Sequence, residues 1–123
     1  MSGALPRAIA PLALMALIFY LSGQEQVGPA LPAFTRVIAH FSEYALLATL
    51  WAWALWPVLG RRALYAAATI SLLYAISDEI HQSFVPGRDS DPLDVLVDAI
   101  GIATALSLIA ARRAASRRPR TSR

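Results

Sequence analysis

The sequence predicts an all-α fold, an integral membrane bundle of four transmembrane helices. Hydrophobic residues make up 57% of the 123 residues and charged residues only 15%, whereas a soluble domain carries about 25% charged residues. Four apolar stretches of roughly 18–22 residues follow one another, each close to the ~20 residues that cross a bilayer. The length allows a single domain, and the lack of cysteine excludes disulfides and thiolate metal sites.

The first helix is expected over residues 5–22, because no charged residue lies between Arg7 and Glu25. Such an N-terminus could also be a signal peptide. However, the segment after Tyr20 has no small-x-small cleavage site directly after the apolar run, so we predict a retained helix. The next residues, 23–32 (GQEQVGPALP), are rich in glycine and proline and are predicted to form a loop with a short interfacial turn.

The second helix is expected over residues 37–59. Its segment ALLATLWAWALWPVL is apolar on every side, which argues against a soluble four-helix bundle, because each helix of such a bundle needs a polar stripe. The tight connection GRR leads to the third helix, residues 63–84. The fourth helix, residues 92–111, follows the turn VPGRDSDP, whose Pro92 suits the first position of a helix.

Residues 1–111 are therefore expected to form one membrane domain, followed by a basic tail at residues 112–123. A basic tail can bind nucleic acid, but this one directly follows an apolar helix and has no interleaved aromatic residues. We predict no nucleic-acid partner and interpret the tail as a cytoplasmic anchor near anionic lipid. Its arginines are Arg112, Arg113, Arg117, Arg118, Arg120 and Arg123.

The placement of arginine predicts the orientation of the helices. Arg7, the arginine pair after Gly60 and the tail all belong to one side of the bundle. The opposite side has Arg36 and Arg88, accompanied by Glu25, Asp89 and Asp91. Both termini are therefore expected in the cytoplasm.

Every acidic and histidine residue within the predicted helices lies in an outer half of its helix. At about 100° per residue, these residues share one face of each helix, with Glu79 at the margin of its face. The faces are expected to turn inward, because a charge facing lipid costs at least ~2.5–3.5 kcal/mol. Gly101 and Ala105 continue the acidic stripe of the fourth helix and would let another helix approach closely. The polar residues are His40, Glu43 and Tyr44, then Asp78, Glu79, His81 and Gln82, and finally Asp94 and Asp98.

These polar residues are candidates for proton transfer or substrate binding. Asp98 lies roughly 9 Å along the helix axis from Pro92, so it needs a partner, a proton or a wet cavity. Five carboxylates crowded in a low dielectric cannot all stay ionised. The alternative is that the residues only hydrogen-bond neighbouring helices and set the helix register.

A metal site is the sharpest competing interpretation. The imidazoles and carboxylates suit zinc or manganese, but their spacing matches no ligand pattern such as H-E-x-x-H, and we predict no metal. Ser42, Ser77 and Ser83 belong to no nucleophile motif, and the sequence leaves the cofactor, if there is one, unknown.

Several segments resemble the VanZ-like membrane proteins: FYLSGQ, HFSEYALL and SDEIHQSFVPGRDSDPLDVLVDAIG. The resemblance covers about residues 18–108. Family members commonly have asparagine at the position of Asp98, and often a lysine just before the histidine of the second helix, where Arg36 is the nearest cation here. The specific core is D-E-x-x-Q-x-x-x-P-G-R followed by D-x-x-x-[ND]-x-x-G, carried by Asp78, Glu79, Gln82, Pro86, Gly87, Arg88, Asp94, Asp98 and Gly101.

The resemblance implies a bacterial inner-membrane location and a connection to the cell envelope, since the family is named for a protein linked to teicoplanin resistance. It implies no particular reaction. We interpret the outer side as a site that binds or modifies an envelope component, such as a lipid-linked or amphipathic molecule. The expected catalytic groups are His40, as general base, with Glu43, Asp78 and Glu79. The expected binding residues are Tyr44, His81, Gln82, Arg88, Asp94 and Asp98.

The rival hypothesis is a proton- or cation-coupled transport component, or a membrane scaffold without chemistry. Transport needs access from both sides of the membrane, and the apolar inner halves of the helices oppose that in a monomer. An oligomer could supply what one chain lacks. Whether the protein is an enzyme stays open at the level of the sequence.

Overall fold

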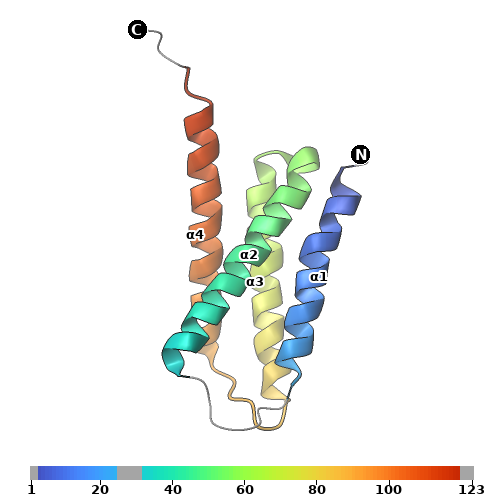
Figure 1. Ribbon diagram of the computed structural model, residues 1–123, viewed down its shortest axis with the longest axis vertical. Helices are drawn as coiled ribbons and strands as arrows, with labels where there is room; N and C mark the ends of the chain where they lie inside the picture. Colours follow the sequence, from blue (N-terminus) through green and yellow to red (C-terminus); the bar gives the residue numbers. More distant parts are fainter. Residues whose placement is uncertain (1–2, 25–31, 120–123) are drawn as a thin grey trace.

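The computed structural model describes residues 3–24 and 32–119, and these residues form four helices and no strand. The helices are α1 (Ala4–Ser22), α2 (Ala33–Leu59), α3 (Arg62–Ser83) and α4 (Pro92–Ser116). Figure 1 shows them side by side along one long axis. The prediction of an all-α bundle is confirmed.

The two ends of the bundle differ in chemistry. The start of α1, the α2–α3 connection and the end of α4 lie at one end, which we call the arginine end after Arg61, Arg113 and Arg117 (Figure 1). The α3–α4 connection and the starts of α2 and α4 lie at the other, which we call the acidic end after Asp78, Asp94 and Asp98. α2 and α4 therefore run in the same direction, opposite to α1 and α3.

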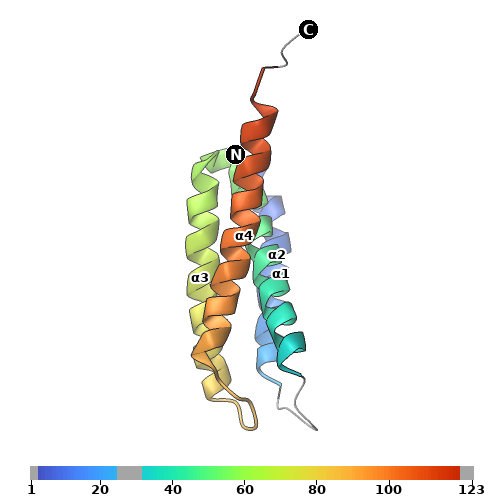
Figure 2. The ribbon, with the colours of Figure 1, turned by 90° about the vertical axis from the view of Figure 1, so that its left-hand side faces the viewer.

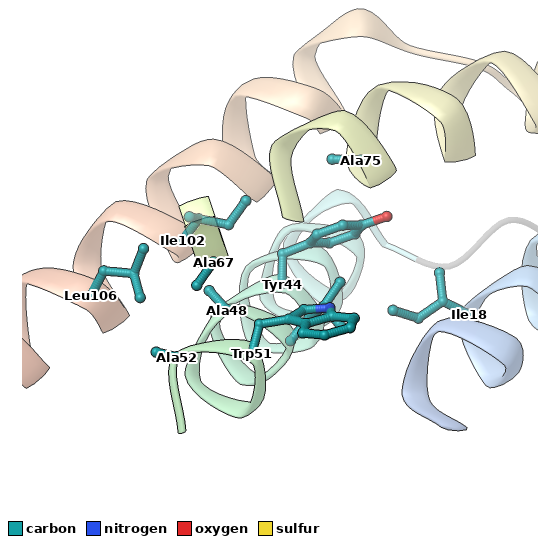
Figure 3. Close-up of a cluster of buried hydrophobic side chains, with 10 residues drawn as sticks. Ile18, Tyr44, Ala48, Trp51, Ala52, Ala67, Ala75, Ile102 and Leu106 are labelled. Atoms are coloured by element: carbon teal, nitrogen blue, oxygen red, sulfur yellow. The ribbon is translucent and has the colours of Figure 1, made fainter. Parts of the chain in front are cut away.

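α2 is the central helix and contacts all three others. Tyr44, Leu47 and Ala48 on α2 are fully buried, and they pack with side chains from α1, α3 and α4 (Figure 3). Small alanines on α2 and α3 bring the helices close together. The core of the bundle away from the acidic end is therefore apolar and dense.

The outer surface of the bundle is also apolar. Large side chains such as Leu5, Leu73 and Leu108 are more than 60% exposed, which a soluble bundle of this size would avoid over so wide an area. α1, α3 and α4 are long and apolar enough to cross a membrane. The chain is therefore a membrane protein.

The number of such helices differs from the prediction, because three of the described helices meet these criteria and α2 does not. α2 is 27 residues long, so length is not the reason. Its first half carries Arg36, His40 and Glu43, and its second half carries tryptophans, whose indole N–H makes them less apolar than leucine.

The helix boundaries depart from the predicted ones by more than one residue at two places. α2 begins at Ala33 rather than at residue 37, and α4 continues to Ser116 instead of ending at residue 111. Figure 2 shows that α4 extends beyond its neighbours at the arginine end. α4 begins at Pro92 as predicted, and the Asp91 side chain caps it by accepting a hydrogen bond from Leu93 N at 2.9 Å.

The connection between α2 and α3 is as tight as predicted, and it turns at Gly60, whose positive φ of 55° is a conformation that glycine adopts without strain. Most of the predicted loop at residues 23–32, together with Glu25, lies outside the described residues, as do Arg120 and Arg123. The division into a membrane domain and a tail stays a prediction.

Candidate functional site

The first polar cluster joins α2 to α4 at the acidic end. We call Arg36, His40, Asp94 and Asp98 the imidazole cluster. His40 Nδ1 lies 2.9 Å from Asp98 Oδ1 and His40 Nε2 lies 3.7 Å from Asp94 Oδ2. Arg36 Nη2 donates a hydrogen bond to the same Asp94 oxygen at 3.0 Å.

The spacing of these four residues follows from the helix repeat. On each helix the two residues are four apart, so they stand one above the other on one face. α2 and α4 run in the same direction, and Arg36 therefore meets Asp94 while His40 meets Asp98. Asp98 is only 2% exposed and Asp94 only 8%, so His40 and Arg36 supply the partners that two buried carboxylates require.

A glycine sets the distance between α2 and α4. A Cβ atom on Gly101 would lie 2.5 Å from the carbonyl oxygen of Phe41 and 3.2 Å from its Cα. The two backbones touch at this point, and only glycine fits. Phe41 follows His40 directly, and Gly101 lies less than one helical turn from Asp98. The close approach at Gly101 therefore brings His40 and Asp98 within contact distance of each other.

The second polar cluster surrounds Asp78 and joins α1, α2 and α3. We call Ser22, Tyr44, Asp78 and Gln82 the Asp78 cluster. Ser22 Oγ donates a hydrogen bond to Asp78 Oδ1, Tyr44 OH donates one to Asp78 Oδ2 at 3.3 Å, and Gln82 Nε2 lies 3.5 Å from the same oxygen. All four residues are buried, and the carboxylate is surrounded by neutral donors.

Ser22 is a member of this cluster that the sequence reasoning missed. It also accepts a hydrogen bond from Gln82 Nε2 at 3.3 Å. The segment FYLSGQ could have indicated this role, because Ser22 ends an otherwise apolar helix. A hydroxyl that is buried at such a place needs a hydrogen-bond partner.

Replacing Tyr44 by phenylalanine is expected to lower the free energy of unfolding by about 1 kcal/mol, the net contribution of a typical buried hydrogen bond. The change removes one donor from Asp78 and leaves the ring in the core. Unfolding in mixed micelles, followed by circular dichroism, measures it. Tyr20→Phe is the control, because Tyr20 is 63% exposed, and removal of its hydroxyl should leave the free energy of unfolding unchanged. Equal behaviour of the two variants would contradict the assigned hydrogen bond.

Glu43 and Arg88 are the two charged candidate residues of the acidic end that belong to neither cluster and have no side-chain partner among the described residues. Within residues 3–24 and 32–119, neither forms a side-chain hydrogen bond or an ion pair, and both are half-buried. The charge of Glu43 interacts with His40 and Asp98 of the imidazole cluster, with Asp78 of the other, and with Arg88. Glu43 therefore lies within electrostatic reach of both clusters.

Glu79 and His81 are not part of either cluster. Glu79 Oε1 accepts a hydrogen bond from Ser90 Oγ at 2.7 Å, in the α3–α4 connection. The His81 ring stacks on Phe19 of α1, with 4.5 Å between the ring centroids and an interplanar angle of 5°. At about 100° per residue, these two residues flank the face of Asp78 on opposite sides, which is why they turn away from it.

The structure also bears on the three serines and on the alternative interpretation of a metal site. Ser77 and Ser83 donate their hydroxyls to carbonyl oxygens of their own helix, those of Tyr74 and Ile80, and Ser42 is exposed. In the part of the chain that the structure describes, no group of three histidine or carboxylate side chains is arranged to hold a metal ion.

Comparison with known proteins supplies one match. A family model described as VanZ/LLP1 matches residues 8–113, a range that includes every residue of both polar clusters. No curated protein and no solved structure matches the chain.

Proposed function

The chain belongs to the VanZ/LLP1 family, and we propose that it binds or modifies an amphipathic component of the bacterial cell envelope at its acidic end. In this proposal the protein resides in the bacterial inner membrane. Binding of the envelope component would link the protein to resistance against glycopeptides such as teicoplanin. The coarser part of the proposal, a membrane protein of this family, follows from the long apolar helices and the family match. The remainder rests on the polar residues of the acidic end.

The proposed topology has four membrane-crossing helices and both termini in the cytoplasm. α2 runs alongside α3 and α4 (Figure 1) and directs its polar first half into the bundle through Tyr44 and His40. Arginines at the start of α1, in the α2–α3 connection and at the end of α4 support a cytoplasmic arginine end. The acidic end would then face the outer leaflet.

The observation that carries the proposal is a pair of half-buried, oppositely charged groups, Glu43 and Arg88, beside two satisfied clusters. Asp78, Asp94 and Asp98 already have partners, so the bundle does not need Arg88 to satisfy them. A carboxylate accepts hydrogen bonds from ammonium or hydroxyl groups, and a guanidinium binds phosphate or carboxylate. A ligand with both kinds of group and an apolar tail fits this end of a membrane protein.

If the ligand is also modified, the imidazole cluster supplies the acid–base group. Asp98 holds one nitrogen of His40 at 2.9 Å, which orients the ring as a second group orients a general base. Glu43 would bind the polar atoms of the substrate, and Asp78, held by Ser22, Tyr44 and Gln82, would keep α1, α2 and α3 together beside it. Glu79 then holds the α3–α4 connection in place through Ser90, and His81 holds α1 in place through Phe19.

Transport is less well supported, because a path through the membrane needs polar groups along its length. Beyond the acidic end the core contains Leu47, Ala48, Ala52, Ile102 and Leu106. These side chains offer no hydrogen-bonding group to an ion, and the buried Trp51 Nε1 and Ser71 Oγ add two polar atoms rather than a continuous polar path. The geometry therefore favours binding at one surface.

The test is to extract the protein with its surrounding lipid and identify co-purifying envelope lipids by mass spectrometry. Glu43→Gln and Arg88→Ala are each expected to reduce the retained species by about tenfold or more, the loss expected from one charge-assisted hydrogen bond. Asp89→Asn is the matched control, because this exposed acid adjoins Arg88 and forms no side-chain hydrogen bond or ion pair within the described residues. It should retain the species fully.

Two results would overturn the proposal. One is the absence of any enriched envelope lipid, together with pH-driven cation flux into liposomes that Glu43→Gln abolishes, which would establish transport. The other is equal loss of the species in Asp89→Asn, which would show a general effect of surface charge.

A further inference from the structure

A crevice of about 290 Å³ lies at the arginine end, where α2, α3 and α4 come together. Three arginines line it: Arg61 from the α2–α3 connection, Arg113 near the end of α4, and Arg117 directly after α4. The crevice is at the opposite end from both polar clusters, and nothing in the proposed function uses it.

The arginines of this crevice have no acidic partner in the described parts of the chain. All acidic residues there lie between residues 43 and 98, and the ion pairs formed involve only the imidazole cluster. The guanidinium of Arg113 lies 3.5 Å from the centroid of the Trp56 ring. This cation–π contact holds the group over the indole and leaves the N–H edge free to bind an anion.

The rest of the crevice is apolar. Trp56, Leu64 and Ala110 form its walls, and such surfaces give a small hydrated anion nothing to bind. A tryptophan at the end of an apolar helix is typical of the boundary between hydrocarbon and headgroups. The combination of arginines at the mouth with apolar walls below them matches a phosphate that carries acyl chains.

We propose that this crevice is a binding site for an anionic phospholipid. Its headgroup phosphate lies between Arg61 and Arg117, with Arg113 as a third donor, and the first part of an acyl chain packs against Leu64 and Ala110. The lipid supplies negative charge that the described residues lack at this end. The site would anchor the end of α4, which extends beyond the other helices (Figure 2).

Native mass spectrometry of the full chain, released from detergent and titrated with phosphatidylglycerol or phosphatidylcholine of the same acyl length, tests the site. Phosphatidylglycerol should bind about tenfold more tightly than phosphatidylcholine, and Arg61→Gln/Arg117→Gln should remove that preference. The matched control is Arg62→Gln/Arg118→Gln, which removes the same charge from neighbouring positions outside the crevice. It should weaken binding by less than about threefold, because those charges act only through a screened field.

A second variant tests the apolar part of the crevice without changing any charge. Ala110→Phe fills the space below the arginines and should weaken phosphatidylglycerol binding as the double arginine variant does. The proposal is overturned if both double variants lose the lipid equally, or if Ala110→Phe binds it like the unchanged chain. It is also overturned if inorganic phosphate displaces the lipid through the same two arginines, which would identify a site for free anions.

Discussion

Replacing His40 by alanine is expected to cost about 3 kcal/mol of the free energy of unfolding, because Asp98 would remain buried without its partner. The Asp98 side chain is 2% exposed, and its contact with His40 Nδ1 is 2.9 Å long. Asp94 would also lose the imidazole, but it keeps Arg36 at 3.0 Å. The expected cost is at the lower end of the range for broken buried pairs, since His40 itself retains some access to solvent.

Unfolding by sodium dodecyl sulfate in mixed micelles, followed by circular dichroism, measures this cost. Asp98→Asn is the matched variant, because its amide oxygen still accepts a hydrogen bond from a neutral imidazole and no charge is left buried. The double variant His40→Ala/Asp98→Asn should be more stable than His40→Ala alone. If the cost of Asp98→Asn adds in full to the cost of His40→Ala, the two residues do not interact, and the His40–Asp98 pair is refuted.

Replacing Gly101 by alanine is expected to cost about 2 kcal/mol, within the range for overpacking a tight contact. Alanine normally stabilises a helix by about 1 kcal/mol relative to glycine, so a net loss can come only from the contact with α2. The added Cβ would lie 2.5 Å from Phe41 O, and because both sides are backbone, the helices must move apart. That movement lengthens the His40–Asp98 contact as well.

Ala103→Val serves as the control for Gly101→Ala. Ala103 lies two residues further along α4 and is exposed, so added volume there meets no neighbouring helix. The same unfolding measurement should show a change of less than about 0.5 kcal/mol, as for other surface substitutions. A Gly101→Ala variant as stable as the unchanged chain would show that α2 and α4 are further apart than described.

The sequence by itself determined the class of the protein and the end of the bundle at which polar residues gather. Apolar stretches long enough for a bilayer define the helices, and Pro92 marks the start of α4, because such local signals need no knowledge of neighbouring segments. Helix periodicity also placed Asp94 and Asp98 on one face, with Gly101 and Ala105 as small residues that would let another helix approach closely. These properties belong to single helices, so they can be read from single segments.

Only the tertiary structure decided which polar groups meet. Periodicity gives the angle of a residue around its own helix, but not the rotation or the axial offset of the helix beside it. The contact of Gly101 with Phe41 sets that offset for α2 and α4 and places Asp98 opposite His40. The packing of α1 brings Ser22 to Asp78 and turns His81 onto Phe19. Most of the expected polar residues are therefore divided between two clusters, and Glu43 and Arg88 form no side-chain hydrogen bond or ion pair among the described residues.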